Sequence, residues 1–126
     1  MIREDYLMRQ IEIIARTLAK LLFDKTVTEY IITDYEYLSE SDMIHSKLLR
    51  MIDEKRLNEA ENLLFEQIET ETEENPGSKV YLEIAIDFYS RLNELSNNIL
   101  HECEFEREEI DEGLRETAEI YGVTVL

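Results

Sequence analysis

Hydrophobic residues recur at helical intervals along most of the chain, and the first such segment covers residues 3–23. Its apolar positions follow one another at intervals of four, three, four and three residues, and a polar stripe lies on the opposite side. These apolar positions are Leu7, Ile11, Ile14, Leu18 and Leu21. Further small and apolar residues widen this face, so we predict an amphipathic helix that packs against more than one neighbour.

A second long helix is predicted over residues 79–95, where the apolar positions again follow one another at intervals of four, three, four and three. They are Tyr81, Ala85, Phe88, Leu92 and Leu95. A neighbouring apolar stripe makes the buried face wide, so we expect this helix to pair with the one at residues 3–23. Ser78, which follows the turn at Pro76, is expected to cap its start.

The C-terminal part of the chain predicts a short helical turn and then a last helix. The turn ends at about Glu102, and a hydrophobic staple around Glu106 predicts the start of the last helix. Gly122 stands where a left-handed residue is needed at the end of a helix. Residues 123–126 are therefore expected to fold back or to fray.

A helical hairpin is predicted in the middle of the chain. Ser39, followed three residues later by Asp42, is typical of a capping box at a helix start. A second helix begins at about Leu57, and so short a link makes the two helices antiparallel. With a small residue at Ala60 the hairpin resembles a tetratricopeptide unit, but no second copy follows at a period of roughly 34 residues. A plain helical hairpin is therefore favoured over a true repeat.

The segment at residues 26–38 differs from the rest of the chain because β-branched and aromatic residues dominate it. They are Val27, Thr28, Tyr30, Ile31, Ile32, Thr33, Tyr35 and Tyr37. We predict an extended connector here. A helix remains the alternative, because the spacing from Val27 through Ile31 and Tyr35 to Leu38 also fits one face of a helix.

Length and composition favour one small all-α domain. The chain has 126 residues, 44% of them hydrophobic, with one Pro and three Gly. We predict a single domain over residues 1–126, a small helical bundle of about five main helices. No signal sequence or membrane-length apolar run of roughly 20 residues is visible. The single cysteine, Cys103, forms no internal disulfide, and these features together predict a cytoplasmic protein.

The net charge of the chain limits the kinds of partner that it can bind. The chain has 30 acidic and 13 basic residues, a formal net charge of -17, so we expect it to bind neither nucleic acid nor a membrane surface. Residues 61–126 hold 18 of the acids and 4 of the basic residues. Solvated helix faces are the simplest explanation of this acidity. Mimicry of nucleic acid by the acidic half is a further alternative.

Candidate catalytic and metal-binding residues give a weak signal. Acidic residues three positions apart could hold Mg²⁺ between facing helices, as in an all-α hydrolase that needs a divalent metal and acts on a nucleotide-like substrate. Two pairs with this spacing are Glu66 with Glu69 and Glu108 with Asp111. With 30 acids in 126 positions, such pairs arise readily by chance. His45, His101 and Cys103 do not form a zinc-ligand set. We therefore predict no catalytic residue, no metal and no cofactor, and keep the hydrolase as the alternative.

Four segments and a final dipeptide support a family resemblance. They are residues 1–11 (MIREDYLMRQI), 59–66 (EAENLLFE), 88–96 (FYSRLNELS) and 105–110 (FEREEI), with Tyr121-Gly122. Across nearly all of its length the chain resembles a family of short, uncharacterised bacterial proteins, a domain of unknown function found mainly in Gram-positive species. The resemblance implies a small all-helical protein with no assigned activity, and it supplies no catalytic residues.

The seven tyrosines point to protein interaction, because tyrosine is favoured at interfaces. Packing inside the protein is their simpler role. The predicted contact surface consists of Arg3, Asp5, Tyr6 and Arg9 on the first helix and Tyr30, Tyr35 and Tyr37 in the connector. We expect a non-catalytic intracellular interaction or assembly protein with an unknown protein partner. The wide apolar faces of the two long helices also predict a homodimer.

Overall fold

Six helices form the fold of the computed structural model, which describes residues 2–125 of the backbone and the side chains of residues 4–125. They are α1 (Ile2–Phe23), α2 (Glu40–Asp53), α3 (Leu57–Glu74), α4 (Val80–Glu94), α5 (Asn97–Glu102) and α6 (Arg107–Ile120). No strand occurs among the described residues. The predicted all-α bundle is confirmed.

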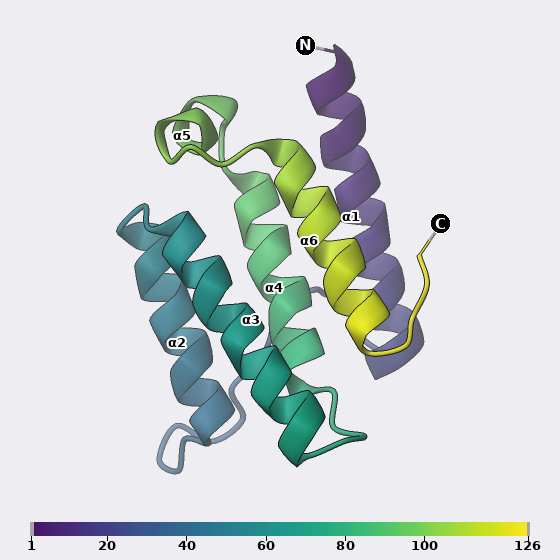
Figure 1. The fold of residues 1–126 in the computed structure, drawn as a ribbon, viewed down its shortest axis with the longest axis vertical. Helices are drawn as coiled ribbons and strands as arrows, with labels where there is room; N and C mark the ends of the chain where they lie inside the picture. The colour runs from purple at the N-terminus through teal and green to yellow at the C-terminus, as the bar shows by residue number, and fades with distance from the viewer. Residues whose placement is uncertain (1, 126) are drawn as a thin grey trace.

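Helix α4 lies at the centre of the bundle and contacts α1, α2, α3 and α6. Ten of its 15 residues are buried, which agrees with the two apolar stripes in its sequence. Helices α1 and α6 pack on one side of α4 and the α2–α3 hairpin packs on the other, while the short α5 joins the ends of α4 and α6 (Figure 1). The predicted pairing of the two long helices, α1 and α4, is confirmed.

The buried face of α1 is rotated slightly from the predicted one. Ile11, Ile14 and Leu18 are buried as expected, but Leu21 is 77% exposed. The partly buried Leu22 packs against the core at this turn instead. A strict alternation of three and four residues drifts around a helix of 3.6 residues per turn, so the last position of the stripe moves away from the core.

Local sequence signals set the start of α2 and the end of α6. The Ser39 hydroxyl accepts a hydrogen bond from the Asp42 backbone N–H at 3.1 Å, and the Asp42 carboxylate accepts one from the Ser39 N–H at 3.0 Å. This is the predicted capping box. Gly122 follows α6 with a φ of 85°, the left-handed conformation expected of it. The chain then folds back, and Arg115 Nη1 donates to the Val125 carbonyl at 3.0 Å.

The expectation that Ser78 caps α4 was wrong. Its hydroxyl donates to Glu71 Oε2 at 2.9 Å, and Lys79 occupies the capping position without a side-chain bond. Glu71, a buried residue near the end of α3, takes over the capping function, because its Oε1 accepts the backbone N–H of Tyr81 at 3.2 Å. A tertiary contact has replaced the local cap.

Residues 24–39, between α1 and α2, form neither helix nor strand, as predicted for the extended connector. Two contacts attach this segment to α4. Lys25 Nζ lies 2.9 Å from Glu83 Oε2, and the Tyr30 backbone N–H donates to Asp87 Oδ1 at 3.2 Å. The connector therefore runs along α4 before the chain enters α2.

Gly113 on α6 lies against the ring of Tyr89 on α4. A Cβ at residue 113 would lie 2.6 Å from the Tyr89 ring carbon Cζ, and closer still to the hydroxyl oxygen. The ring cannot easily move away, because it is fully buried and its hydroxyl donates to Glu61 Oε2 at 2.7 Å. The close packing of α4 and α6 therefore requires glycine here.

We predict that Gly113→Ala lowers the free energy of unfolding by about 1–3 kcal/mol, because the added methyl group overpacks the α4–α6 contact. In a helix interior the same change normally stabilises by about 1 kcal/mol. Urea unfolding measures the effect, with Glu112→Ala at the neighbouring exposed position as the control. A Gly113→Ala variant as stable as the unmodified protein would contradict the close contact.

Candidate functional site

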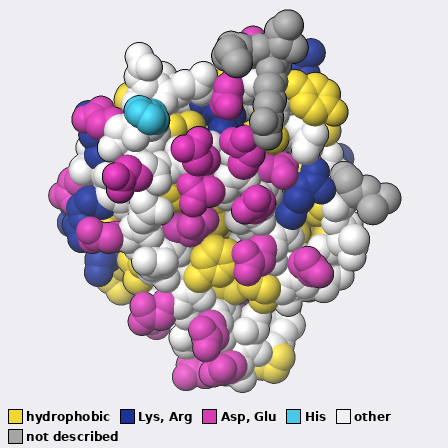
Figure 2. Space-filling model, turned by 45° about the horizontal axis from the view of Figure 1, so that its top comes forward, with side chains coloured by type: hydrophobic (Ala, Val, Ile, Leu, Met, Phe, Trp, Pro, Cys, Tyr) yellow, Lys and Arg dark blue, Asp and Glu magenta, His cyan; other side chains and the backbone are white. Residues whose placement is uncertain are grey.

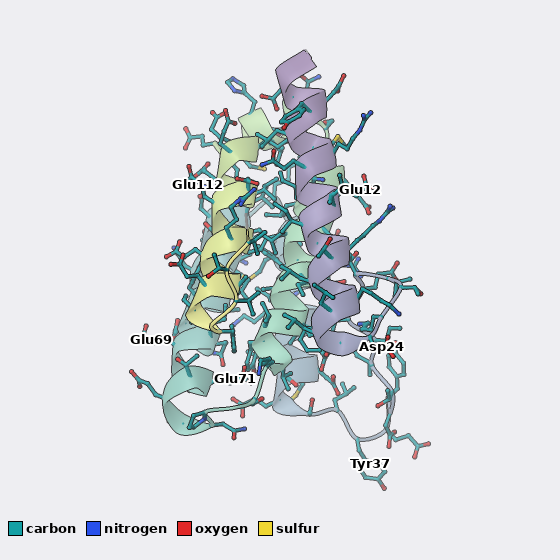
Figure 3. All side chains as sticks on the ribbon, turned by 90° about the vertical axis from the view of Figure 1, so that its right-hand side faces the viewer. Glu12, Asp24, Tyr37, Glu69, Glu71 and Glu112 are labelled. Atoms are coloured by element: carbon teal, nitrogen blue, oxygen red, sulfur yellow. The ribbon has the colours of Figure 1, made fainter. Side chains whose placement is uncertain are left out.

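The structure separates the predicted contact surface into two parts. Asp5, Tyr6 and Arg9 lie in the N-terminal half of α1. Tyr30, Tyr35 and Tyr37 lie in the connector, and Tyr37 extends from the body of the molecule beyond the other end of that helix (Figure 3). The side chain of Arg3 lies outside the described residues. The two parts therefore form separate candidate surfaces.

The first surface is a row of exposed apolar side chains on α1, which we call the α1 stripe: Tyr6, Ile13 and Leu21. Their exposed fractions are 69%, 58% and 77%. Intervals of seven and eight residues, about two helical turns each, keep the three on one side of the helix. The sequence identified Tyr6 in this row. It missed Ile13 as a surface residue and assigned Leu21 to the core.

A hollow of about 310 Å³ adjoins the stripe where α1 meets α6. Tyr6, Arg9 and Ile13 line it from α1, and Arg115 lines it from α6. Arg115 is held by Asp111, whose Oδ2 lies 3.1 Å from its Nε. Two arginines thus flank the apolar stripe in a protein whose visible face in Figure 2 carries many acidic side chains.

The connector tyrosines have different surroundings. Tyr30 is half-buried: its hydroxyl donates to Asp42 Oδ1 at 2.6 Å, and its ring centroid lies 4.8 Å from that of His45. Burial and the hydrogen bond to Asp42 raise the pKa of Tyr30 above its ordinary value. Tyr35 and Tyr37, in contrast, are 77% and 79% exposed. Tyr30 therefore fixes the connector in place, and Tyr35 and Tyr37 are available for contact.

Beneath Tyr30 lies a buried polar cluster that the sequence did not reveal. Asp87 on α4 is 1% exposed and accepts hydrogen bonds from three parts of the chain. His45 Nε2 on α2 lies 2.8 Å from Oδ2, Arg91 Nε donates at 2.9 Å, and the Tyr30 backbone N–H donates at 3.2 Å. We call His45, Asp87 and Arg91 the Asp87 cluster. The one available signal was an acidic residue inside an apolar run, four positions before an arginine.

The carboxylate of Asp87 is ionised despite its burial. Burial by itself raises its pKa, but hydrogen bonds from His45 and Arg91 outweigh that effect and hold the pKa below the ordinary value of 3.8. An ionised carboxylate only accepts hydrogen bonds, so His45 Nε2 carries a proton and donates it. The other ring nitrogen, Nδ1, is buried without a hydrogen-bond partner among the described residues.

Convergent metal ligands are not found in the described part of the chain: no three His, Cys, Asp or Glu side chains there come together as a metal site. The pairs Glu66 with Glu69 and Glu108 with Asp111 thus gain no third ligand of these types. The hydrolase alternative needs several carboxylates around one ion. The geometry offers no observation in its favour.

A family comparison matches the model of a family of unknown function (DUF6483) to residues 1–122. The chain belongs to this family. The match confirms that the four sequence segments indicated a family of unknown function, and it includes every residue of the α1 stripe, the connector and the Asp87 cluster. Neither the curated proteins nor the solved structures contain a match to the chain. Among the described residues of this DUF6483 protein, no helix has the length and apolar character needed to cross a membrane.

We predict that Asp87→Asn destabilises the DUF6483 protein by about 3 kcal/mol at neutral pH, because it removes a buried charge and leaves its donors imperfectly paired. The folded-state pKa of Asp87 lies below its unfolded value, so its stabilisation is present above about pH 4 and is lost as the pH falls through the folded-state pKa. The difference between the two proteins therefore shrinks in acid.

Urea unfolding at several pH values measures this difference. Asp53→Asn, at an exposed position at the end of α2, removes the same charge without touching the cluster and serves as the control. We expect it to change the stability by no more than about 0.5 kcal/mol. An Asp87→Asn variant with the stability and pH dependence of this control would show that the cluster contributes nothing.

Proposed function

We propose that this DUF6483 protein acts in the cytoplasm as a non-catalytic interaction protein, and that it forms a homodimer through the α1 stripe. The observation that carries the proposal is the exposure of Tyr6, Ile13 and Leu21 on a helix whose other side is buried in the core. Covering a large apolar side chain contributes about 1.5–3 kcal/mol. The single Cys103 supports the cytoplasmic setting.

Charge favours α1 as the place where two copies meet. Its sequence contains four basic and three acidic residues. Helix α3 has seven acidic and no basic residues, and α6 has six acidic and two basic residues. Contacts through α3 or α6 would bring like charges together, which costs free energy at a low-dielectric interface. A contact through α1 avoids most of that repulsion.

The order of residues along α1 suits an antiparallel pair related by a two-fold axis. Tyr6 and Leu21 lie at similar distances on either side of Ile13. In such a pair Tyr6 of one copy lies near Leu21 of the other, and the two Ile13 side chains meet close to the axis. The acidic first turn, with Glu4 and Asp5, then lies near Lys20 of the other copy. In this arrangement apolar side chains face apolar side chains, and acidic side chains face a basic one.

The connector is the surface that we assign to a different protein partner. Tyr35 and Tyr37 are more than three-quarters exposed, and Tyr30 anchors the segment that carries them. Exposed tyrosines on an anchored loop bury large areas on contact while losing little conformational freedom. In the proposed dimer each copy would offer one such connector, because Tyr37 extends beyond the end of α1 (Figure 3).

We predict that the protein sediments with the mass of two 15.0 kDa chains at micromolar concentration. Ile13→Glu and Leu21→Glu each introduce a charge into the stripe and should convert the dimer to a monomer, because a buried, unpaired charge is costly. Both positions are exposed within one chain, so the helical circular dichroism and the unfolding temperature of the monomer should change little.

Met43→Glu is the matched control. Met43 is a 53% exposed apolar residue on α2, far along the chain from the stripe. This variant should remain a dimer. A monomeric unmodified protein, or equal dissociation by Met43→Glu and Ile13→Glu, would overturn the proposed α1 interface.

A further inference from the structure

A hollow of about 400 Å³ lies between the connector, α2 and α4, next to the Asp87 cluster. Its apolar walls include Ile32 and Tyr35 from the connector and Leu49 from α2. His45 and Arg91 supply polar groups. The hollow therefore combines an apolar body with two nitrogen-bearing side chains, as small-molecule sites commonly do.

Arg91 is oriented by one edge and leaves the other edge available. Its Nε donates to both oxygens of Asp87, at 3.0 and 2.9 Å, which fixes the plane of the guanidinium. Its Nη groups form no hydrogen bond to the described residues, and the side chain is 38% exposed. A fixed guanidinium with open N–H groups is suited to a planar carboxylate.

His45 lines the same hollow. Its Nε2 proton is used by Asp87, and Nδ1 is closed to water, so a molecule in the hollow would pack against the imidazole ring and would not bond to Nδ1. The ring is therefore a reporter of whether the hollow is occupied.

We propose that this hollow binds a small molecule with one carboxylate and an apolar body. The carboxylate binds the open Nη groups of Arg91, and the apolar body packs against Ile32, Tyr35 and Leu49. A single negative charge is favoured over a phosphate or a polyanion, because Glu29 also lines the hollow and the chain is strongly acidic. The proposal is independent of the α1 dimer.

The test uses benzoate as the probe and the ring signals of the two histidines in NMR spectra. Benzoate should shift the His45 signals saturably, with a dissociation constant on the order of millimolar, and should leave the exposed His101 on α5 unchanged. Benzamide, which has the same shape without the charge, should bind at least tenfold more weakly.

Two exposed tyrosines provide matched variants. Tyr35→Ala removes part of the wall and should weaken benzoate binding several-fold, whereas Tyr37→Ala, at a residue that does not line the hollow, should leave it unchanged. Arg91→Gln should weaken benzoate binding at least tenfold. If this variant is also less stable, the comparison of Tyr35→Ala with Tyr37→Ala still tests the proposal. The proposal is overturned if benzoate gives no saturable shift of His45, if benzamide binds equally well, or if both tyrosine variants behave alike.

Discussion

Burial of α4 in the middle of the bundle is the constraint on which the rest of the structure depends. Helices α1 and α6 and the α2–α3 hairpin pack around it, so apolar side chains must cover most of its circumference, and ten of its 15 residues are buried. With eight buried hydrophobic residues, α4 contributes more of them to the core than any other helix of the described chain. Asp87 and Asn93, the buried polar residues of α4, lie in the same water-free environment, so each of them needs a partner.

Those polar groups fix where the neighbouring elements lie along α4. Asp87 accepts hydrogen bonds from the Tyr30 backbone N–H of the connector and from His45 of α2. Asn93, near the other end of α4, donates to the Met8 carbonyl of α1 at 2.8 Å and accepts from Arg107 of α6 at 2.9 Å. Apolar packing brings the helices together, and these directional bonds determine their register. The α1 stripe and the tip of the connector remain exposed to solvent and are therefore available for function.

Sequence reasoning succeeded where the signal is local and failed where the partner is distant. The capping box at Ser39 and the turn at Gly122 depend on neighbours within a few residues, and both are present. The role of Asp87 depends on His45, 42 positions earlier, and no periodic pattern encodes that contact. Ser78 was assigned to a local cap, but a tertiary bond to Glu71 took its place. The sequence therefore predicted the exposed tyrosines of the candidate surface, but it did not predict the buried carboxylate of Asp87.

Native-state hydrogen exchange tests the central position of α4 most directly. If α4 is the core, its amide protons between Ile84 and Leu92 exchange only when the whole molecule unfolds, with the free energy that urea unfolding yields. Amides of the short α5 should exchange through smaller openings. Exchange of the α4 amides at a lower free energy than those of α2 or α3 would contradict the account, because the helix that holds the others in place cannot open before them.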